Sequence, residues 1–378
     1  MIVFEEKNSC CGCTACMNSC PKKAIIMKED EEGFLYPSIN KELCVECGIC
    51  KSVCPFIDTT SYDRLLEIEA YGAKHKSDDI RMQSASGGIF TAISDKILAS
   101  GGVVYGARFD ENFNVIHSRA TNKIDRDKFR GSKYVQSFLG FIFKQVKRDL
   151  EEGKYVLFSG TPCQVAGLNN YLKKDYEKLI TCDIVCHGTP SPKIFAEFIE
   201  YMEKRQQSKI IDLSFRDKEQ GWENQKWKIE YKNGKAFVES DDLRIYRRLF
   251  YKHYIHRPSC HNCKFTNLER PSDITIGDFW GDKESISKII DNKGISLVLV
   301  NSIKGKIILQ DIKNDIELIS CGVGRCMQPQ LEYPTEVAEN RNDFWDDYNY
   351  KGFEYVAKKY GSYKWIDKVK ISIKKILK

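Results

Sequence analysis

Residues 9–21 read Ser-Cys-Cys-Gly-Cys-Thr-Ala-Cys-Met-Asn-Ser-Cys-Pro, a stretch dominated by cysteine. Four of its cysteines follow the spacing C-x2-C-x2-C-x3-C-P, and the same spacing returns over residues 44–55. Three thiolates two residues apart can wrap a loop around three corners of an iron-sulfur cubane, while the fourth, followed by proline, reaches a second cubane. The repeated spacing therefore predicts two [4Fe-4S] clusters.

The exchange of the fourth cysteine assigns the ligands of each cluster, in the pattern typical of bacterial ferredoxins. We define a first cysteine set of Cys10, Cys13, Cys16 and Cys54, and a second cysteine set of Cys20, Cys44, Cys47 and Cys50. Cys11 is left over and is interpreted as a small packed side chain. The alternative is a pair of structural zinc sites, although zinc does not require the C-x3-C-P step twice. We assign residues 1–60 to a ferredoxin domain.

The composition is that of an ordinary globular protein of two or three domains, with 378 residues, 42% of them hydrophobic and 30% charged. No apolar stretch approaches the roughly 20 residues of a membrane span, and residues 1–8 lack the features of a signal peptide. We therefore expect a cytoplasmic protein. In a reducing compartment, the 16 cysteines indicate metal binding or redox chemistry rather than disulfides.

The end of the chain is basic, since residues 351–378 hold nine lysines against two acidic residues. Residues 364–378 have the pattern of an interfacial amphipathic helix, which would contact the inner membrane surface peripherally. Its apolar face comprises Trp365, Ile366, Val369, Ile373, Ile376 and Leu377. The alternatives are packing on the body or on an acidic partner. Because the basic charge is confined to this tail, we expect no nucleic-acid partner.

After a polar linker over residues 58–69, strand-like runs alternate with helical ones. Strands are expected over residues 103–109, 155–158 and 180–185, helices over 88–99 and 138–152, and a hairpin over 227–238. The predicted fold class is α+β, with the ferredoxin domain followed by a mixed α/β body over residues 61–330. Residues 331–378 form the expected C-terminal segment.

Four segments that contain glycine lie in these elements or at their ends, at residues 84–88, 106–107, 130–137 and 159–164. In the last segment, Thr161 is expected to cap a helix whose first turn contains Pro162. Exposed amides at such helix starts favour phosphate, although a glycine before a helix is more often a plain turn. No G-x-G-x-x-G is present, so an ordinary Rossmann dinucleotide site is not predicted.

Four further cysteines follow predicted strand or loop ends, and they form a third cysteine set of Cys163, Cys186, Cys260 and Cys263. Our hypothesis is a third cluster close to the active site of the body. The alternatives are zinc or simply buried thiols, because free cysteine is among the most buried residue types. His187 and His261, which adjoin members of this set, are interpreted as surface or packing residues.

Six segments of the body together resemble the family of coenzyme F420 hydrogenase/dehydrogenase beta subunits, from about residue 70 to residue 323. These segments are residues 86–92, 101–107, 131–137, 160–164, 183–188 and 272–281. The resemblance implies a flavin-binding body that holds FAD, with an iron-sulfur cluster nearby. It also implies hydride exchange between FAD and coenzyme F420.

Carried over position by position, the resemblance assigns flavin-contact candidates and makes the third cysteine set the candidate ligands of the third cluster. The flavin candidates are Ser86, Gly87, Gly88, Lys133, Tyr134, Gly160, Thr161 and Gln164. Lys133 is also the candidate catalytic residue, since its charge could set the flavin's electronics or meet an anionic cofactor. The alternative for Lys133 is a solvated surface lysine.

Our functional hypothesis is an FAD-dependent iron-sulfur oxidoreductase that passes electrons between [4Fe-4S] clusters and FAD. A flavin takes up a hydride as two electrons and releases them singly, as a hydride carrier such as coenzyme F420 on one side and clusters on the other require. The alternative is an electron-transfer subunit that docks on a ferredoxin-like or enzyme redox partner and does not use F420. A zinc-stabilised binding protein is the third hypothesis, and the doubled C-x3-C-P argues against it.

Overall fold

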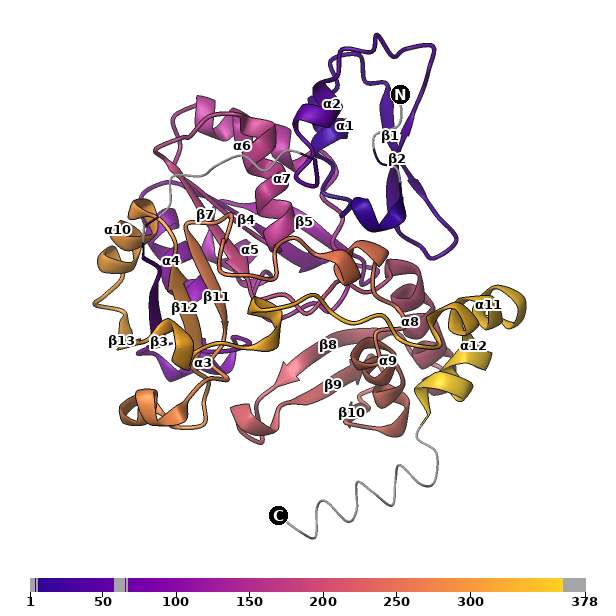
Figure 1. Ribbon diagram of the computed structural model, residues 1–378. Coiled ribbons are helices and arrows are strands. Elements are labelled where there is room, and N and C mark those ends of the chain that lie inside the picture. The colour runs from indigo at the N-terminus through magenta and orange to yellow at the C-terminus, as the bar shows by residue number, and fades with distance from the viewer. Residues whose placement is uncertain (1–3, 5, 58–64, 66, 363–378) are drawn as a thin grey trace.

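The computed structural model describes residues 4, 6–57, 65 and 67–362 (Figure 1). The predicted tail helix over residues 364–378 lies outside the described residues, as does most of the predicted linker. No helix in the described part of the chain is both long enough and apolar enough to cross a bilayer.

The N-terminal module contains two short helices and one hairpin, namely α1 (Ala15–Ser19), α2 (Ile49–Ser52), β1 (Ile25–Glu29) and β2 (Leu35–Ile39). The strands pair antiparallel. Each helix begins after a residue with left-handed backbone, Thr14 with φ 64° and Gly48 with φ 75°. The two cysteine repeats therefore fold in the same way, as the repeated spacing predicts.

The body is built on an eight-stranded mixed sheet with the order β13-β3-β12-β11-β7-β6-β4-β5. The bounds are β3 (Glu69–His75), β4 (Val103–Phe109), β5 (Val115–Ala120), β6 (Val156–Gly160), β7 (Leu179–Ile184), β11 (Ile274–Asp278), β12 (Ser296–Val300) and β13 (Ile316–Cys321). Strands β4, β6, β7 and β11 run parallel to one another, and the other pairs are antiparallel. The carboxyl ends of four central strands therefore meet at one edge of the sheet.

Helices cover both faces of this sheet, because the strand residues alternate between two apolar cores. Val103 and Tyr105 pack with α6 (Ile142–Glu151) and α7 (Pro162–Leu172), whereas Val104 packs with α4 (Ile89–Ala99) and α10 (Ile303–Asp311). Two shorter helices, α3 (Asp78–Met82) and α5 (Lys123–Asp127), complete this part. The N-terminal module packs on the face covered by α6 and α7 (Figure 1).

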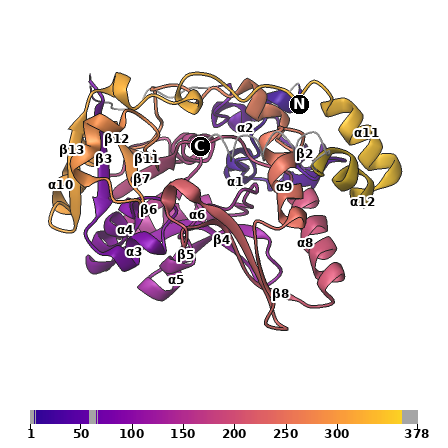
Figure 2. The ribbon, with the colours of Figure 1, turned by 90° about the horizontal axis from the view of Figure 1, so that it is seen from below.

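A second, antiparallel sheet stands apart from the first and has the order β10-β9-β8 (Figure 2). Its strands are β8 (Ile210–Asp217), β9 (Lys226–Tyr231) and β10 (Ala236–Val238). It shares one apolar core with α8 (Pro192–Gln206), α9 (Asp241–Tyr251), α11 (Arg341–Lys351) and α12 (Phe353–Val356). Residues from the end of the described chain, such as Phe344 and Val356, are therefore part of the body's core.

The predicted fold class, α+β with an N-terminal ferredoxin-like module, is confirmed. The predicted strands and the hairpin are present with shifts of one or two residues at their ends. The predicted helix over 138–152 begins only at Ile142, because Gly140 has left-handed backbone with φ 52° and turns the chain. Thr161 and Gln164 form a capping box at the start of α7, with Pro162 as its first residue.

Candidate functional site

The thiols of the first cysteine set converge in the N-terminal module. Burial raises the pKa of the Cys16 thiol, and its neighbours Cys10 and Cys54 raise it further. Burial likewise raises the pKa of Cys54, with a contribution from Cys10. Cys13 also lies near Cys16 and Cys54. The distant Cys54 thus joins the three cysteines of the other repeat, as the ligand exchange predicts.

The second cysteine set surrounds a small cavity beside the first. All four of its members line this cavity, together with Gly48 and Val45. Cys47 is exposed at its rim. The Sγ of Cys20 accepts a hydrogen bond from the backbone amide of Ala24 at 3.3 Å, and such bonds stabilise cluster ligands.

The third cysteine set comes from three separate places in the body. Cys163 lies in the first turn of α7, Cys186 follows β7, and Cys260 and Cys263 lie in and just after a 3-10 turn at Pro258–Asn262. Burial raises the pKa of Cys186, and the neighbouring thiols Cys260, Cys163 and Cys263 raise it further. The fold therefore brings these four thiols together.

Backbone amides and hydroxyls point at the sulfurs of the third cysteine set. Gly188 N–H donates to Cys186 Sγ at 3.4 Å, and Phe265 N–H donates to Cys263 Sγ at 3.4 Å. Thr189 N–H donates to Cys260 Sγ at 3.3 Å, and Thr161 Oγ1 lies 3.2 Å from Cys163 Sγ. Donors in these positions stabilise thiolates and tune a bound cluster.

Within the described ranges, no group of three or more His, Cys, Asp or Glu side chains is arranged to hold a single metal ion. The ligands of a cubane bind four different iron atoms, so they stand farther apart than the ligands of one ion. The cysteines of the second set line one small cavity, and the thiols of the first and of the third set lie near one another within each set. This arrangement fits a polynuclear cluster. Burial disfavours the charged thiolates, and the positive iron of a bound cluster would favour them.

A cavity of about 520 Å³ opens where the parallel strands of the large sheet end. Its wall includes Gly106 of β4, Gly160 of β6, Ile184 of β7 and Asp278 of β11, all in the carboxyl halves of their strands. This edge is where open α/β sheets bind ligands, and the volume lies within the roughly 300–1,000 Å³ typical of ligand sites. Cys186 lines the same cavity, so the third cysteine set lies next to it through this one member.

Most of the predicted flavin contacts line this cavity. They are Ser86, Gly88, Lys133, Tyr134, Gly160, Thr161 and Gln164. Gly87 does not line it, because its backbone packs against β3 and β12, where an added Cβ would stand 2.4 Å from Ala73 O. Its amide instead donates to Ser296 Oγ at 3.0 Å. Gly87 thus holds the loop against the large sheet and does not itself line the cavity.

Lys133 is half-buried in the loop between α5 and α6, and its ammonium group is held by backbone carbonyls. Its Nζ donates to three carbonyl oxygens, of Lys128 at 3.0 Å, Arg130 at 2.7 Å and Gly131 at 3.2 Å. Burial lowers the pKa of Lys133 to about 7. The side chain therefore holds the glycine loop of residues 130–134 in a closed turn against the cavity.

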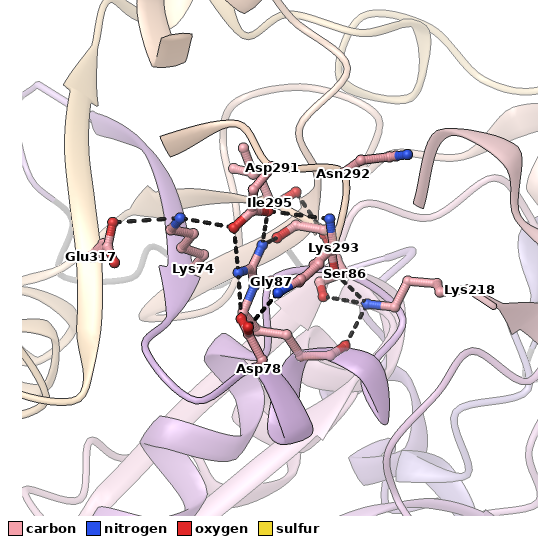
Figure 3. Close-up of polar contacts among 12 residues, drawn as sticks. Lys74, Asp78, Ser86, Gly87, Lys218, Asp291, Asn292, Lys293, Ile295 and Glu317 are labelled. Carbon is pink, nitrogen blue, oxygen red and sulfur yellow. Dashed lines mark hydrogen bonds and ion pairs between the residues drawn. The ribbon is translucent and has the colours of Figure 1, made fainter. Parts of the chain in front are cut away.

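A polar network fixes the other glycine loop, residues 84–88 (Figure 3). Lys218 Nζ donates to Ser86 O at 3.0 Å, to Lys293 O at 2.8 Å and to Arg81 O. Ser86 Oγ donates to Ile295 O at 2.7 Å, and the buried Arg81 pairs with Asp291. The loop is thus held from below while its amides and the Ser86 side chain reach the cavity wall.

Several cavity residues were not singled out from the sequence. His117 is buried, with Nε2 3.0 Å from Ser159 O and Nδ1 2.9 Å from Ser137 Oγ. Arg216 donates to Tyr134 Oη at 2.9 Å and pairs with Asp278 at 2.5 Å. Gln225 also lines the cavity, and its buried Nε2 has no hydrogen-bond partner among the described residues. Asp278 stands in a motif quoted for the family resemblance, whereas His117, Arg216 and Gln225 carry no motif.

The comparisons with known proteins bear on both parts of the chain. Residues 153–321 match the family described as the C terminus of the coenzyme F420 hydrogenase/dehydrogenase beta subunit. Residues 9–57 match the 4Fe-4S dicluster domain family. The second match spans every member of the first and second cysteine sets.

Two curated relatives are similar over most of their length. The F-subunit of the F(420)H(2) dehydrogenase of Methanosarcina mazei is 22% identical, over 88% of this chain and 94% of the relative. An uncharacterized protein of Methanocaldococcus jannaschii is 26% identical, over 76% of this chain and 85% of the relative. A chain from the F420-reducing [NiFe] hydrogenase complex of Methanosarcina barkeri is 17% identical, with a TM-score of 0.47 over 77% of this chain and 90% of that one.

Proposed function

Since the chain belongs to the family of coenzyme F420 hydrogenase/dehydrogenase beta subunits, with a dicluster 4Fe-4S ferredoxin domain in front, we propose a function in electron transfer. It is an iron-sulfur oxidoreductase related to F420 dehydrogenases and hydrogenases. We propose that it passes electrons between three [4Fe-4S] clusters and an FAD in the cavity of the body. Coenzyme F420 is the hydride carrier proposed beyond the flavin.

One observation carries this proposal, namely that the cavity and the third cysteine set share a wall. Cys186 lines the cavity and is also grouped with Cys163, Cys260 and Cys263. Cys163 in turn is in contact with Cys11, which stands between Cys10 and Cys13 of the first set. A chain of sites from the N-terminal module to the cavity supports electron transfer rather than storage.

The residues around the cavity fit a flavin nucleotide. Glycines permit close approach of a planar ring or a phosphate to the backbone, while Arg130, Lys133 and Arg216 supply positive charge for an anionic cofactor. The unpartnered Gln225 Nε2 offers a buried donor. FAD, when bound, would accept a hydride as two electrons and release them singly. The predicted flavin contacts, with Lys133 as the candidate catalytic residue, are part of this proposal.

The experiment that tests the proposal is the iron, zinc and flavin content per chain of protein prepared without oxygen. We expect about twelve irons and one FAD, as three [4Fe-4S] clusters require. About eight irons with FAD would remove the third cluster and keep the oxidoreductase. Zinc without flavin would overturn the proposal.

A second experiment separates an enzyme that uses F420 from an electron-transfer subunit that docks on another enzyme. Reduced coenzyme F420 is added to the purified chain with a one-electron dye as acceptor. Turnover without any partner supports the first. Flavin that is reduced only by ferredoxin, with no reaction of F420, favours the second, in which the chain reduces a partner enzyme or its substrate.

For residues 364–378 we propose peripheral contact with anionic lipid, on the basis of their sequence pattern alone. Co-sedimentation with vesicles that contain an anionic lipid should fall when this segment is deleted. Unchanged binding would contradict the proposed contact.

A further inference from the structure

Arg257 is a buried arginine at the boundary between the N-terminal module and the body. Its side chain is 1% exposed, and it precedes the 3-10 turn that carries Cys260. Its Nε donates to Cys10 O at 2.7 Å, and its Nη2 donates to Leu35 O at 3.0 Å. The guanidinium therefore fastens the first cysteine loop to the body.

The positive charge of Arg257 has no carboxylate partner among the residues that the structure describes. Its remaining contacts are neutral: Nη1 donates to Gln136 Oε1 at 2.9 Å, and the guanidinium lies 4.2 Å from the centre of the Tyr36 ring and 5.3 Å from that of Phe34. A buried charge that lacks a counter-charge costs several kcal/mol. A negatively charged group near Arg257 would offset this cost.

The groups that can supply this negative charge are the cysteine sulfurs on either side. Arg257 Nη2 lies 3.7 Å from Cys10 Sγ, which belongs to the first cysteine set. On the other side, Arg257 begins the turn that carries Cys260, and its backbone oxygen accepts a hydrogen bond from Cys260 N–H at 2.9 Å. The guanidinium also favours the thiolates of Cys260 and Cys163. A cubane with four thiolate ligands is an anion, and reduction adds one more negative charge to it.

Gly12 shows how closely the arginine is fitted into the cysteine loop. A Cβ at Gly12 would stand 2.9 Å from Arg257 Nη1, and the backbone there has φ +70°. Gln136 completes the fit, because its Nε2 donates to Cys11 O at 2.9 Å. The loop therefore leaves room for the guanidinium and turns the carbonyl of Cys10 toward it.

We propose that Arg257 is a positioning residue that acts as the shared counter-charge of the clusters bound by the first and third cysteine sets, raising the reduction potential of both. The inference rests on the proposed function, since it requires a cluster in the third set. Each reduction adds one electron to a cluster and moves no proton, and the fixed cation favours the reduced state of both neighbours. Electrons would thus cross the boundary between two clusters whose reduced states are both favoured by the same cation.

The test is a reductive titration of the cluster-loaded protein with dithionite, followed by electron paramagnetic resonance. For Arg257→Gln, we expect the ratio of reduced to oxidised cluster at a fixed potential to fall at least tenfold for two clusters. A tenfold change corresponds to about 59 mV for one electron. The cluster of the second set, identified by the signal that Cys47→Ser alters, should change less than twofold.

The matched control is Arg341, which also joins the module to the body but is neutralised there. Its Nη1 donates to Glu32 Oε1 at 2.8 Å, and both side chains are buried. The double variant Glu32→Gln/Arg341→Gln removes that contact without changing the net charge. We expect its cluster potentials to match those of the unaltered protein.

The inference would be overturned if Arg257→Gln shifted the reduction potentials of all three clusters equally, or shifted none of them. It would also be overturned if the double variant Glu32→Gln/Arg341→Gln shifted the potentials as much as Arg257→Gln does. If Arg257→Gln loses iron on purification, Arg257→Lys decides, because it keeps the charge and loses the fork of donors. If the ratio of reduced to oxidised cluster in Arg257→Lys changes by less than threefold, the charge of residue 257 sets the potential. A tenfold fall in that ratio refutes a role of the charge. An iron count of about eight in the unaltered protein would instead show that the third cluster, and with it the shared role, is wrong.

Discussion

The thiols of Cys11 and Cys163 lie within hydrogen-bonding reach of each other, although one belongs to the N-terminal module and the other to the first turn of α7. Cys11 is buried, as expected of a packed side chain, and its neighbours Cys10 and Cys13 belong to the first cysteine set. The first and third sets therefore approach each other at Cys11 as well as at Arg257. Replacing Cys11 and Cys163 in turn therefore tests which of them is a cluster ligand and which is only a packed side chain.

Replacing Cys163 should remove iron, whereas replacing Cys11 should not. For Cys163→Ala we expect iron to fall, by about one atom per chain if a three-iron cluster remains and by about four if the whole cluster is lost. Cys11→Ala should keep the full iron content and lose only about 1–2 kcal/mol of stability from the cavity it leaves. Iron analysis of the two proteins, prepared in parallel without oxygen, makes the comparison. Equal iron loss in both would show that Cys11 is itself a ligand.

The neutral state of His117 predicts a loss of stability in acid. Burial lowers the pKa of His117 to about 4, whereas an unfolded histidine titrates near 6.5. Between these values the unfolded chain binds the extra proton, so stability falls as the pH falls through this window. The contribution of this one residue is about 2 kcal/mol between pH 7 and pH 5.

The variant His117→Gln keeps a hydrogen-bonding side chain and does not titrate. Urea unfolding of both proteins at pH 7 and pH 5 should show a smaller acid loss for the variant, by about that amount. Parallel stability curves for the two proteins would contradict the buried, neutral histidine.

Replacing Lys218 should loosen the loop of residues 84–88. Lys218→Met leaves one buried and two part-buried carbonyl oxygens without their donor, which should lower the free energy of unfolding by about 2–4 kcal/mol. If the loop contacts FAD, affinity should fall at least tenfold, as read from flavin fluorescence on titration of the flavin-free protein. Lys293→Ala is the control, because that side chain is exposed in the same network. Unchanged flavin affinity in Lys218→Met would argue against a role of this loop in binding.

Arg270 should be essential to the third cysteine set without being a ligand. Its Nη1 donates to Phe265 O at 2.6 Å and its Nη2 to Ile184 O at 3.1 Å, so it ties together the segments that carry Cys263 and Cys186. It also pairs with the fully buried Asp183 at 3.0 Å. Arg270→Met should cost about 3–5 kcal/mol, because it leaves that carboxylate buried and alone.

The measurement is urea unfolding together with iron content, and the third set should lose its cluster. Arg325→Met serves as the control, since Arg325 is exposed and lies 3.6 Å from Asp282 at the surface. Its replacement should change stability by less than about 1 kcal/mol. An Arg270→Met protein with full stability and full iron would refute the structural role.

The sequence could predict whatever depends on neighbours along the chain. The strands at residues 103–109 and 227–231 and the capping box at Thr161 follow from patterns a few residues long, and all are present. The helix start at Ile142 could not be predicted, because the apolar pattern begins before it, while the left-handed backbone of Gly140 turns the chain and delays the helix. The cavity residues His117 and Arg216 also escaped, since each occupies an ordinary strand position and only the fold turns it toward the cavity.

The two cluster sites of the N-terminal module were determined by the sequence itself, because three of the four ligands of each set lie within seven residues and a tight loop must gather them. The third set was decided by the tertiary structure. Cys163 and Cys186 follow β6 and β7, which lie side by side and end at the same edge, and the bridge between Pro190 and His256 brings the turn that carries Cys260 to them. Arg257 depends on the fold in the same way, since only the docking of the module on the body buries its charge between two groups of thiols.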